Sequence, residues 1–320
     1  MKNKKLLGNF LLILTAMIWG TAFVSQRVGM EFIEPLTFNA ARYVFGTVAV
    51  GMVALITHLT KRRTPDTRAP EVIRASNAAT LRGGIGCGIF LAVGGFFQQA
   101  GLVYTTAGKA GFITALYMLL VPIVNFLIFK KKNTLQVWLA ILIGVGGMYL
   151  LCVSDGFHLA YGDILVLLCA FMFCGHILCC DHFVRYADPV RMSAIQFAVA
   201  SCLSTAAAFI LEEPSWEKIV SATVPILYCG LISGGVGYTL QIVAQKMTDP
   251  TIASLLMSLE SVFAVIAGAL LLQERMSTRE LIGCVVMFAA IVLVQIPIGR
   301  KKHHDKPSSP SQHRGQDDKL

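Results

Sequence analysis

Apolar residues in this chain come in long runs that polar residues hardly interrupt. The run at residues 251–272 exceeds twenty residues and contains one ionisable side chain, Glu260. A run of this length and composition spans the hydrocarbon core of a bilayer as a helix. The pattern therefore predicts a membrane protein. A carboxyl group at that depth must find a partner, stay protonated or face a water-filled cavity, so Glu260 is a candidate functional residue.

Ten runs of spanning length follow one another along the chain, and together they predict an all-α membrane protein with ten transmembrane helices. They lie at residues 6–26, 36–58, 83–103, 110–129, 137–153, 163–180, 193–211, 225–244, 252–272 and 281–296. The connections are short except at 60–82, so no sizeable domain is expected outside the membrane. The polar tail at 299–320 contains prolines and lacks apolar periodicity, and we expect it to be disordered.

The two halves of the chain repeat each other. A shift of 154 residues places Gly8 on Gly162, Ala16 on Ala170, Trp19 on Phe173, Pro35 on Pro189 and Arg42 on Gln196. Further on, a shift of 143 residues places Gly94 on Gly237, Gln98 on Gln241, Ala110 on Ala253 and Thr134 on Ser277. The predicted repeats are 6–153 and 162–298, with five helices each. Because five is odd, the repeats must enter the membrane from opposite sides, as in many secondary transporters.

Composition and charge agree with this topology. Hydrophobic residues make up 55% of the chain, charged residues 14%, and the mean hydropathy is +0.67, which leaves too little polar surface for a soluble domain. With the N-terminus inside, most basic loop residues are cytoplasmic, and the outer loops keep only Arg27, Lys109, Lys218, Arg275 and Arg279. Both termini are therefore predicted in the cytoplasm and the protein in the plasma membrane. The net charge of +9 is scattered over inner loops, so we expect no nucleic-acid partner.

Three stretches of sequence resemble the two EamA units of the drug/metabolite transporter (DMT) superfamily. They are AMIWGTAF at 16–23, Glu34-Pro35 followed by Arg42-Tyr43, and SLESVFAVIAGALLLQERMS at 258–277. The resemblance extends over residues 6–298. It implies ten helices with both ends in the cytoplasm, and export or exchange of small metabolites such as amino acids, nucleobases or drugs.

The first half departs from this pattern at two places. Tyr117 occupies the position of Glu260, and Lys130-Lys131 occupy the positions of Gln273-Glu274. The two units therefore need not share one role in binding or coupling.

Polar residues within the apolar runs are the candidates for a substrate pathway. The predicted pathway residues are Trp19, Asn39, Arg42, Gln98, Gln99, Tyr117, Gln196, Gln241 and Glu260. Asn39 and Arg42 share one helix face, and Arg42 could contact a substrate anion, snorkel to headgroups or pair with Glu31 or Glu34. Gln98 and Gln241 are repeat-mates that could converge near the pseudo-twofold axis, or form interhelical hydrogen bonds. Glu260 could bind protons or a substrate amine, or accept hydrogen bonds from Ser258 or Ser261.

Other residues within the runs have weaker signals. Pro122 interrupts the backbone hydrogen bonding of the fourth helix and predicts a kink, with gating or packing as its role. Phe23 and Phe96 could supply hydrophobic walls beside Trp19 and Tyr117. His176 and Cys180 are one turn apart, but a tetrahedral metal shell would need ligands that the sequence does not identify, so no metal site is expected.

These observations predict a transporter that moves a small metabolite or drug, by alternating access, toward the outside, with proton coupling left open. A nucleotide-sugar or sugar-phosphate exchanger, or a membrane receptor, remains the alternative. No constellation of catalytic residues stands out, so an enzyme is not expected. The expected partners are a small-molecule substrate and the lipid bilayer, a homodimer is left open, and no cofactor is expected.

Overall fold

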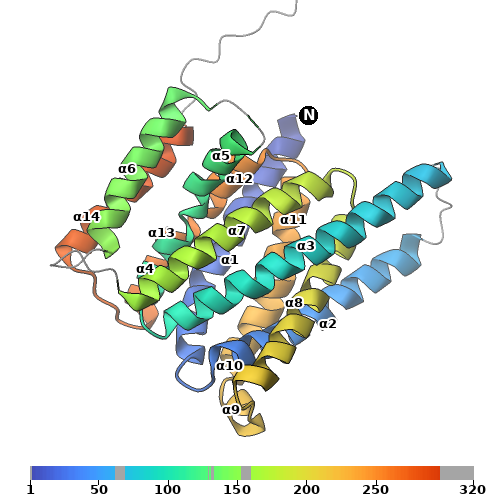
Figure 1. The fold of residues 1–320 in the computed structure, drawn as a ribbon, viewed down its shortest axis with the longest axis horizontal. Coiled ribbons are helices and arrows are strands. Elements are labelled where there is room, and N and C mark those ends of the chain that lie inside the picture. Colours follow the sequence, from blue (N-terminus) through green and yellow to red (C-terminus); the bar gives the residue numbers. More distant parts are fainter. Residues whose placement is uncertain (1, 62–68, 129, 131–132, 153–159, 296–320) are drawn as a thin grey trace, which may run out of the picture.

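The computed structural model describes residues 2–61, 69–128, 130, 133–152 and 160–295 (Figure 1). Within these ranges the regular structure is entirely helical. The tail predicted to be disordered lies outside the described residues.

Each half of the chain supplies one series of helices. The first half contains α1 (Lys2–Gly29), α2 (Pro35–Lys61), α3 (Pro70–Leu102), α4 (Ala107–Thr114), α5 (Tyr117–Leu127) and α6 (Leu135–Cys152). The second half contains α7 (Tyr161–Val184), α8 (Pro189–Leu211), α9 (Trp216–Ser221), α10 (Thr223–Leu227), the π-helix η1 (Tyr228–Tyr238), α11 (Thr239–Gln245), α12 (Pro250–Met257), α13 (Glu260–Leu271) and α14 (Thr278–Gln295).

Seven helical stretches within the described ranges are long and apolar enough to cross a membrane. They are Lys4–Gly29, Pro35–Thr60, Pro70–Leu102, Ala107–Leu127, Tyr161–Val184, Pro189–Leu211 and Thr223–Gln245. The other three predicted segments coincide with α6, with the interrupted pair α12 and α13, and with α14, which are shorter or broken. The structure therefore supports a multi-pass helical membrane protein but not by itself the count of ten spans.

The third helix differs from its prediction. It begins at Pro70 rather than Gly83, so half of the predicted connection at 60–82 is helical. Proline fits the first turn of a helix because that position needs no backbone donor, and Glu71 favours the positive helix start. This turn is exposed and polar, so a search for apolar runs does not detect it.

Two spans are interrupted at matching positions of the two repeats. The break between α4 and α5 falls at residues 115–116, and the break between α12 and α13 falls at residues 258–259. Leu116 N donates to Ile113 O at 3.2 Å, and Leu259 N donates to Leu256 O at 3.3 Å, so each break is a tightened turn that reaches back three residues instead of four. The helices resume at Tyr117 and at Glu260, which are repeat-mates.

Pro122, for which the sequence predicts a kink, lies inside α5. The interruption of this span lies one to two turns earlier. Asn133 Nδ2 donates to Pro122 O at 2.8 Å, which satisfies a carbonyl near the end of α5.

Equivalent helices of the two repeats pack against each other in opposite directions. Leu36, at the start of α2, donates its backbone N–H to Glu212, which follows the end of α8. Further along α2, Gly46 lies against Phe197 of α8. The two repeat-mates α2 and α8 are therefore antiparallel neighbours.

The helix pair α6 and α14 shows the same relationship at one side of the bundle (Figure 1). The Gln136 side chain donates to Leu293 O, which joins the start of α6 to the end of α14. Toward the other end, Gly147 lies against Met287. The third helix of each repeat also makes equivalent contacts. In the first repeat, α3 packs on α7 and α8. Its equivalent in the second repeat, formed by η1 and α11, packs on α1, and η1 also packs on α2.

Candidate functional site

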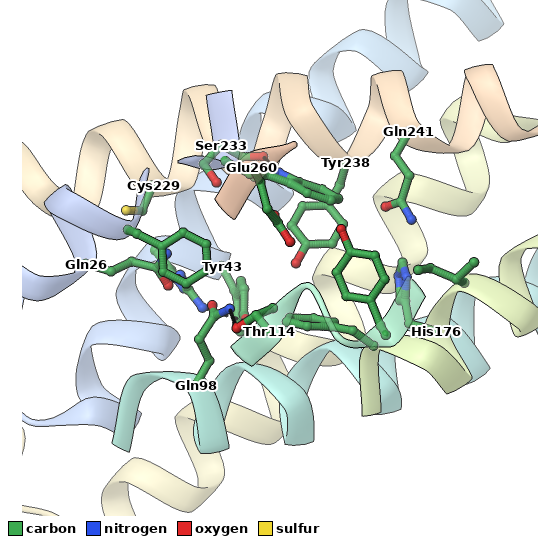
Figure 2. A pocket seen from close by; sticks show the side chains of 17 residues that line it. Gln26, Tyr43, Gln98, Thr114, His176, Cys229, Ser233, Tyr238, Gln241 and Glu260 are labelled. Atoms are coloured by element: carbon green, nitrogen blue, oxygen red, sulfur yellow. Dashed lines mark hydrogen bonds between the residues drawn. The ribbon is translucent and has the colours of Figure 1, made fainter. Parts of the chain in front are cut away.

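An enclosed cavity of about 40 Å³ lies between the two repeats (Figure 2). It is lined by Trp19, Phe23, Gln26, Arg42, Tyr43, Gln98, Thr114, Tyr117, Phe173, His176, Ile177, Cys229, Ser233, Gly234, Tyr238, Gln241 and Glu260. All of these residues are buried except Trp19 and Tyr238, which are half-buried. The space suffices for a few water molecules and is too small for a metabolite.

Four pairs of repeat-mates meet in this cavity. Trp19 and Phe173, Phe23 and Ile177, Gln98 and Gln241, and Tyr117 and Glu260 each occupy the same position of the two repeats and line the same space. Figure 2 shows Gln26, Tyr43 and Gln98 on one side of the cavity, and His176 and Gln241 on the other. The duplicated sequence therefore converges on one central site, as expected for a cavity near a pseudo-twofold axis.

Arg42 of α2 provides a buried positive charge on one wall. Its side chain donates from Nη1 to Gln26 Oε1 at 2.6 Å and from Nη2 to the Tyr43 hydroxyl at 3.1 Å. The guanidinium carbon lies 5.6 Å from the ring centroid of Phe38 and 4.9 Å from that of Tyr43, within the range of cation–π attraction. The Nε group has no hydrogen-bond partner. Arg42 is 6% exposed, so neither snorkelling nor pairing with an outer-loop carboxylate describes it.

Glu260 provides a buried carboxyl group at the first residue of α13. It is 3% exposed, and its Oε1 atom has no hydrogen-bond partner. The Tyr117 hydroxyl lines the same cavity and also lacks a hydrogen-bond partner. Ser261, a predicted donor to Glu260, instead donates to Ser258 O at 2.8 Å.

Arg42 and Glu260 have opposite formal charges, yet neither belongs to an ion pair. The ion pairs of the described residues are Lys109–Asp163, Arg185–Asp181 and Lys218–Glu34. A buried charge without a counter-charge costs several kcal/mol, and polar or aromatic neighbours offset this cost only in part. The closed cavity therefore keeps two groups that a ligand of complementary charge would stabilise.

His176 lies across the cavity from Arg42's partners Gln26 and Tyr43 (Figure 2). Its Nε2 atom is 2.9 Å from Gln196 Oε1, and the Gln196 Nε2 group has no partner. Gln196 does not line the cavity, and its hydrogen bond positions the His176 ring from outside it. In the part of the chain that the structure describes, no three His, Cys, Asp or Glu side chains gather in a way that could hold a metal ion.

Aromatic rings form much of the remaining wall. The Trp19 and Tyr238 ring centroids are 4.6 Å apart, and Tyr238 also packs edge-on against His176 at 5.7 Å. Trp19 Nε1 donates to Ser233 O at 3.2 Å, so the indole is held by η1 and its ring remains available to the cavity. Such walls favour a ligand with an apolar or aromatic part.

Six of the nine predicted pathway residues line the cavity, namely Trp19, Arg42, Gln98, Tyr117, Gln241 and Glu260. The other three do not line it. Gln196 supports His176, and Gln99 donates to Gln26 O at 3.2 Å. Asn39 is fully buried with neither side-chain atom partnered.

Two phenylalanines were expected to supply hydrophobic walls, and one of them does so. Phe23 lines the cavity, whereas Phe96 lines an apolar groove between α2, α3 and α8. The sequence did not single out Gln26, Thr114 or Tyr238, and Tyr43 entered only as part of a motif. One signal was available, because Gln26 is a polar residue at the end of the first apolar run, three residues before α1 ends at Gly29.

Cross-repeat contacts close one end of the bundle with charged groups. This end, where α2 and α4 begin, is called the Glu212 end below. Glu212 accepts from the backbone N–H groups of Leu36 and Thr37 at 2.9 and 2.7 Å, and Glu274 accepts from Ala107 N and Gly108 N at 2.9 and 3.2 Å. Each glutamate of the second repeat thus caps a helix of the first.

Two ion pairs reinforce the Glu212 end. Lys109 Nζ lies 2.8 Å from Asp163 Oδ2, and Lys218 pairs with Glu34. Burial opposes ionisation of Glu34, but the hydrogen bond and charge of Lys218 outweigh it and lower the pKa of Glu34 below its ordinary value of 4.5. Both pairs join the first repeat to the second.

The opposite end, where α3 and α8 begin, is held mainly by hydrogen bonds. Ser76 Oγ donates to Tyr186 O at 2.8 Å, and Asp188 N donates to Thr80 Oγ1 at 3.0 Å. Arg191 Nη1 donates to Asn77 Oδ1 at 2.8 Å. None of these three acceptors carries a charge, and Arg191 supplies a charged donor.

Fold and site together define a multi-pass α-helical membrane protein with an enclosed cavity between two sequence repeats. The EamA-like transporter family matches the chain twice, at residues 6–153 and 160–296. The chain therefore belongs to the EamA-like transporter family, within the DMT superfamily.

Known relatives are similar over almost the whole chain. An uncharacterized transporter of Archaeoglobus fulgidus is 27% identical over 295 residues, which cover 92% of this chain and 88% of the relative. A chloroplast WAT1-related protein of Arabidopsis thaliana is 26% identical over 308 residues, covering 91% of this chain and 71% of the relative. A crystal structure of a protein with 16% identity superposes with a TM-score of 0.65 over 90% of this chain and 98% of that one, which supports the fold.

Proposed function

We propose that this protein moves a small polar or amphipathic metabolite across the cell membrane by alternating access. The observation that carries the proposal is the enclosed cavity of polar and aromatic side chains between two antiparallel repeats. Binding sites of secondary transporters form at such repeat interfaces, often where helices are interrupted. Tyr117 and Glu260 stand at interruptions of this kind.

The proposed topology has ten spans in two inverted repeats, with both termini in the cytoplasm. Its support is the antiparallel packing of α2 on α8 and of α6 on α14, because repeat-mates that cross in opposite directions must enter from opposite sides. The distribution of Lys and Arg over the loops supports an orientation with the Glu212 end outside.

The proposed direction of transport is export. Among the described residues, two ion pairs join the repeats at the Glu212 end, whereas the three hydrogen bonds given for the other end have neutral acceptors, which favours opening at the cytoplasmic end and loading from inside. Glu260 could couple this movement to protons, because a buried carboxyl group can exchange a proton for a ligand.

A phosphate-bearing substrate, as in nucleotide-sugar or sugar-phosphate exchangers, has less support. Phosphate sites gather several Arg or Lys side chains, and Arg42 is the one such residue among the described lining residues. Competition by phosphorylated compounds that is lost in Arg42→Ala would favour this alternative.

The test is flux in proteoliposomes that contain the purified protein and a panel of small polar and amphipathic metabolites. We expect saturable flux of at least one compound, and a severalfold loss in Gln98→Ala and in Gln241→Ala. Leu142→Ala is the matched control, because Leu142 is a residue of α6 with 70% exposure. Unchanged flux in both glutamine variants, in folded protein, would contradict the proposed site.

Direction and coupling need separate measurements. Efflux from cells with and without the protein, repeated with a proton uncoupler, tests export and proton coupling. Tags at the two ends test the topology, because both must be inaccessible from outside in intact cells.

A further inference from the structure

Beyond transport, we infer that the groove between α2, α3 and α8 binds one acyl chain of a phosphatidylethanolamine-like lipid. The lipid enters from the bilayer and places its zwitterionic headgroup at the Glu212 end. The inference needs the membrane location of the protein and does not depend on the proposed transport.

The groove, called the acyl groove below, has an apolar lining. It consists of Leu36 of α2, of Ala92, Val93 and Phe96 of α3, and of Leu203, Ser204, Ala207 and Leu211 of α8. Its volume is about 240 Å³, larger than that of the central cavity. No lining residue is charged, and a space with so few polar partners does not suit water. The lining therefore suits hydrocarbon.

The acyl groove continues the lipid-facing surface of the bundle. Its three helices lie together at one side of the molecule, and each is long and apolar enough to cross a membrane (Figure 1). Ala92 and Ser204 are buried, whereas Val93, Leu203 and Leu211 are exposed. The exposed side chains contact the acyl chains of the bilayer, so the groove is open to the same chains.

The length of the acyl groove matches one leaflet. Along α8 it extends from Leu203 to Leu211. At a rise of 1.5 Å per residue, this stretch is about 12 Å long. One leaflet contributes about 15 Å of hydrocarbon, half of the bilayer core. The groove therefore accommodates most of one chain, with Leu211 nearest the headgroup level.

Packing holds the chain in the acyl groove. A chain that moves from lipid to protein gains no hydrophobic free energy, because both surroundings are apolar. It gains dispersion contacts where walls enclose it, and these weak contacts add up along its length. The acyl groove offers walls from three helices, two of the first repeat and one of the second.

Charged groups at the mouth of the acyl groove select the headgroup. Glu34 directly precedes α2, and Glu212 and Glu213 directly follow Leu211. Lys218 pairs with Glu34 and interacts electrostatically with Glu212 and Glu213. Three carboxylates therefore share one ammonium group. The excess of negative charge repels an anionic headgroup such as phosphoglycerol and attracts the ammonium group of phosphoethanolamine.

The test uses a phosphatidylethanolamine that carries a diazirine in the middle of one acyl chain. Purified full-length protein in maltoside detergent is illuminated with this probe, and mass spectrometry locates the labelled residues. We expect labelling within both 92–96 and 203–211. Unlabelled phosphatidylethanolamine should compete at least fivefold more effectively than phosphatidylglycerol with the same chains. Equal competition by phosphatidylglycerol would overturn the inference, as would labelling confined to other segments.

Two neighbouring alanines of α8 provide a matched pair of variants. Ala207→Phe fills the acyl groove with a ring, whereas Ala206→Phe places the same ring at an exposed position that does not line it. Labelling of 92–96 should fall at least fivefold in Ala207→Phe and stay within twofold in Ala206→Phe. Equal labelling in the two variants would refute the site. Thermal unfolding checks that both are folded, and the competition in the wild type needs neither variant.

A second copy of the chain is the other apolar occupant to exclude. Cross-links between the α8 helices of two copies, in a dimer that Ala207→Phe dissociates, would overturn the lipid site. Flux in proteoliposomes tests the proposed function separately. Flux without labelling of the acyl groove would overturn this inference alone, and labelling without flux of any compound would overturn the transport function alone.

Discussion

Glu212 Oε2 accepts two hydrogen bonds from Thr37, one from its backbone N–H and one from its hydroxyl, each at 2.7 Å. Because Glu212 belongs to the second repeat and Thr37 to the first, this contact must break when the repeats separate at the Glu212 end. The loss of a helix cap costs about 1 kcal/mol.

Glu212→Ala should therefore open the Glu212 end more often. Cys229 lines the cavity and reports the opening as a native thiol. We expect its alkylation by a membrane-impermeant reagent, added outside cells, to increase about fivefold, which corresponds to that free energy. Glu213→Ala is the control, since its neighbour's carboxylate remains. Equal labelling of the two variants would mean that Glu212 does not hold this end closed.

Gly88→Ala should destabilise the protein by about 1–3 kcal/mol. A Cβ atom at Gly88 would lie 2.7 Å from Val199 Cβ and 2.8 Å from Gln196 O, so α3 and α8 would have to move apart. Gly51→Ala is the control, because a Cβ at Gly51 meets no atom within 4 Å and alanine adds about 1 kcal/mol of helix propensity. Thermal unfolding in detergent should place the two variants on opposite sides of the wild type, and the same sign for both would refute the close contact.

His176→Ala should lower stability by about 1–3 kcal/mol, because it leaves the buried Gln196 carbonyl oxygen without its 2.9 Å partner. His182→Ala removes an exposed histidine of the same helix and should change stability by less. Thermal unfolding of the two purified variants tests this difference. A loss as large in His182→Ala would show that the effect belongs to α7 as a whole.

The Lys218–Glu34 pair should not generate pH dependence in the physiological range. Since the folded-state pKa of Glu34 is lowered below 4.5, its stabilising contribution is present above that ordinary value and is lost as the pH falls through the lowered pKa. Glu34→Gln should therefore raise Cys229 labelling by the same factor at every pH between about 5 and 8. A factor that changes across this range would place the titration of Glu34 at a higher pH.

Sequence alone predicted the helical membrane fold, the duplication and about half of the residues that line the cavity. Long apolar runs fix the helices, and repeat-mates such as Gln98 and Gln241 mark positions that the pseudo-symmetry brings together. Polar residues in apolar runs stand out, which is why Arg42 and Glu260 could be recognised.

The interruptions and several lining residues could not be predicted in this way. Ala115 and Leu116 are ordinary helix-forming residues, so the tightened turn that precedes Tyr117 results from packing and not from local propensity. Tyr43 and Tyr238 resemble any aromatic residue of a membrane helix until the fold turns them inward. The extension of α3 to Pro70 had a local signal, the proline at its first turn, but its polar composition hid it in a search for apolar runs.

One span of each repeat is interrupted directly before a repeat-mate, which is Tyr117 in the first repeat and Glu260 in the second. Both residues line the same cavity, so a phenol from the first repeat and a carboxyl group from the second border one space. At this point of the cavity the duplication therefore preserves the position of the side chain and changes its chemistry.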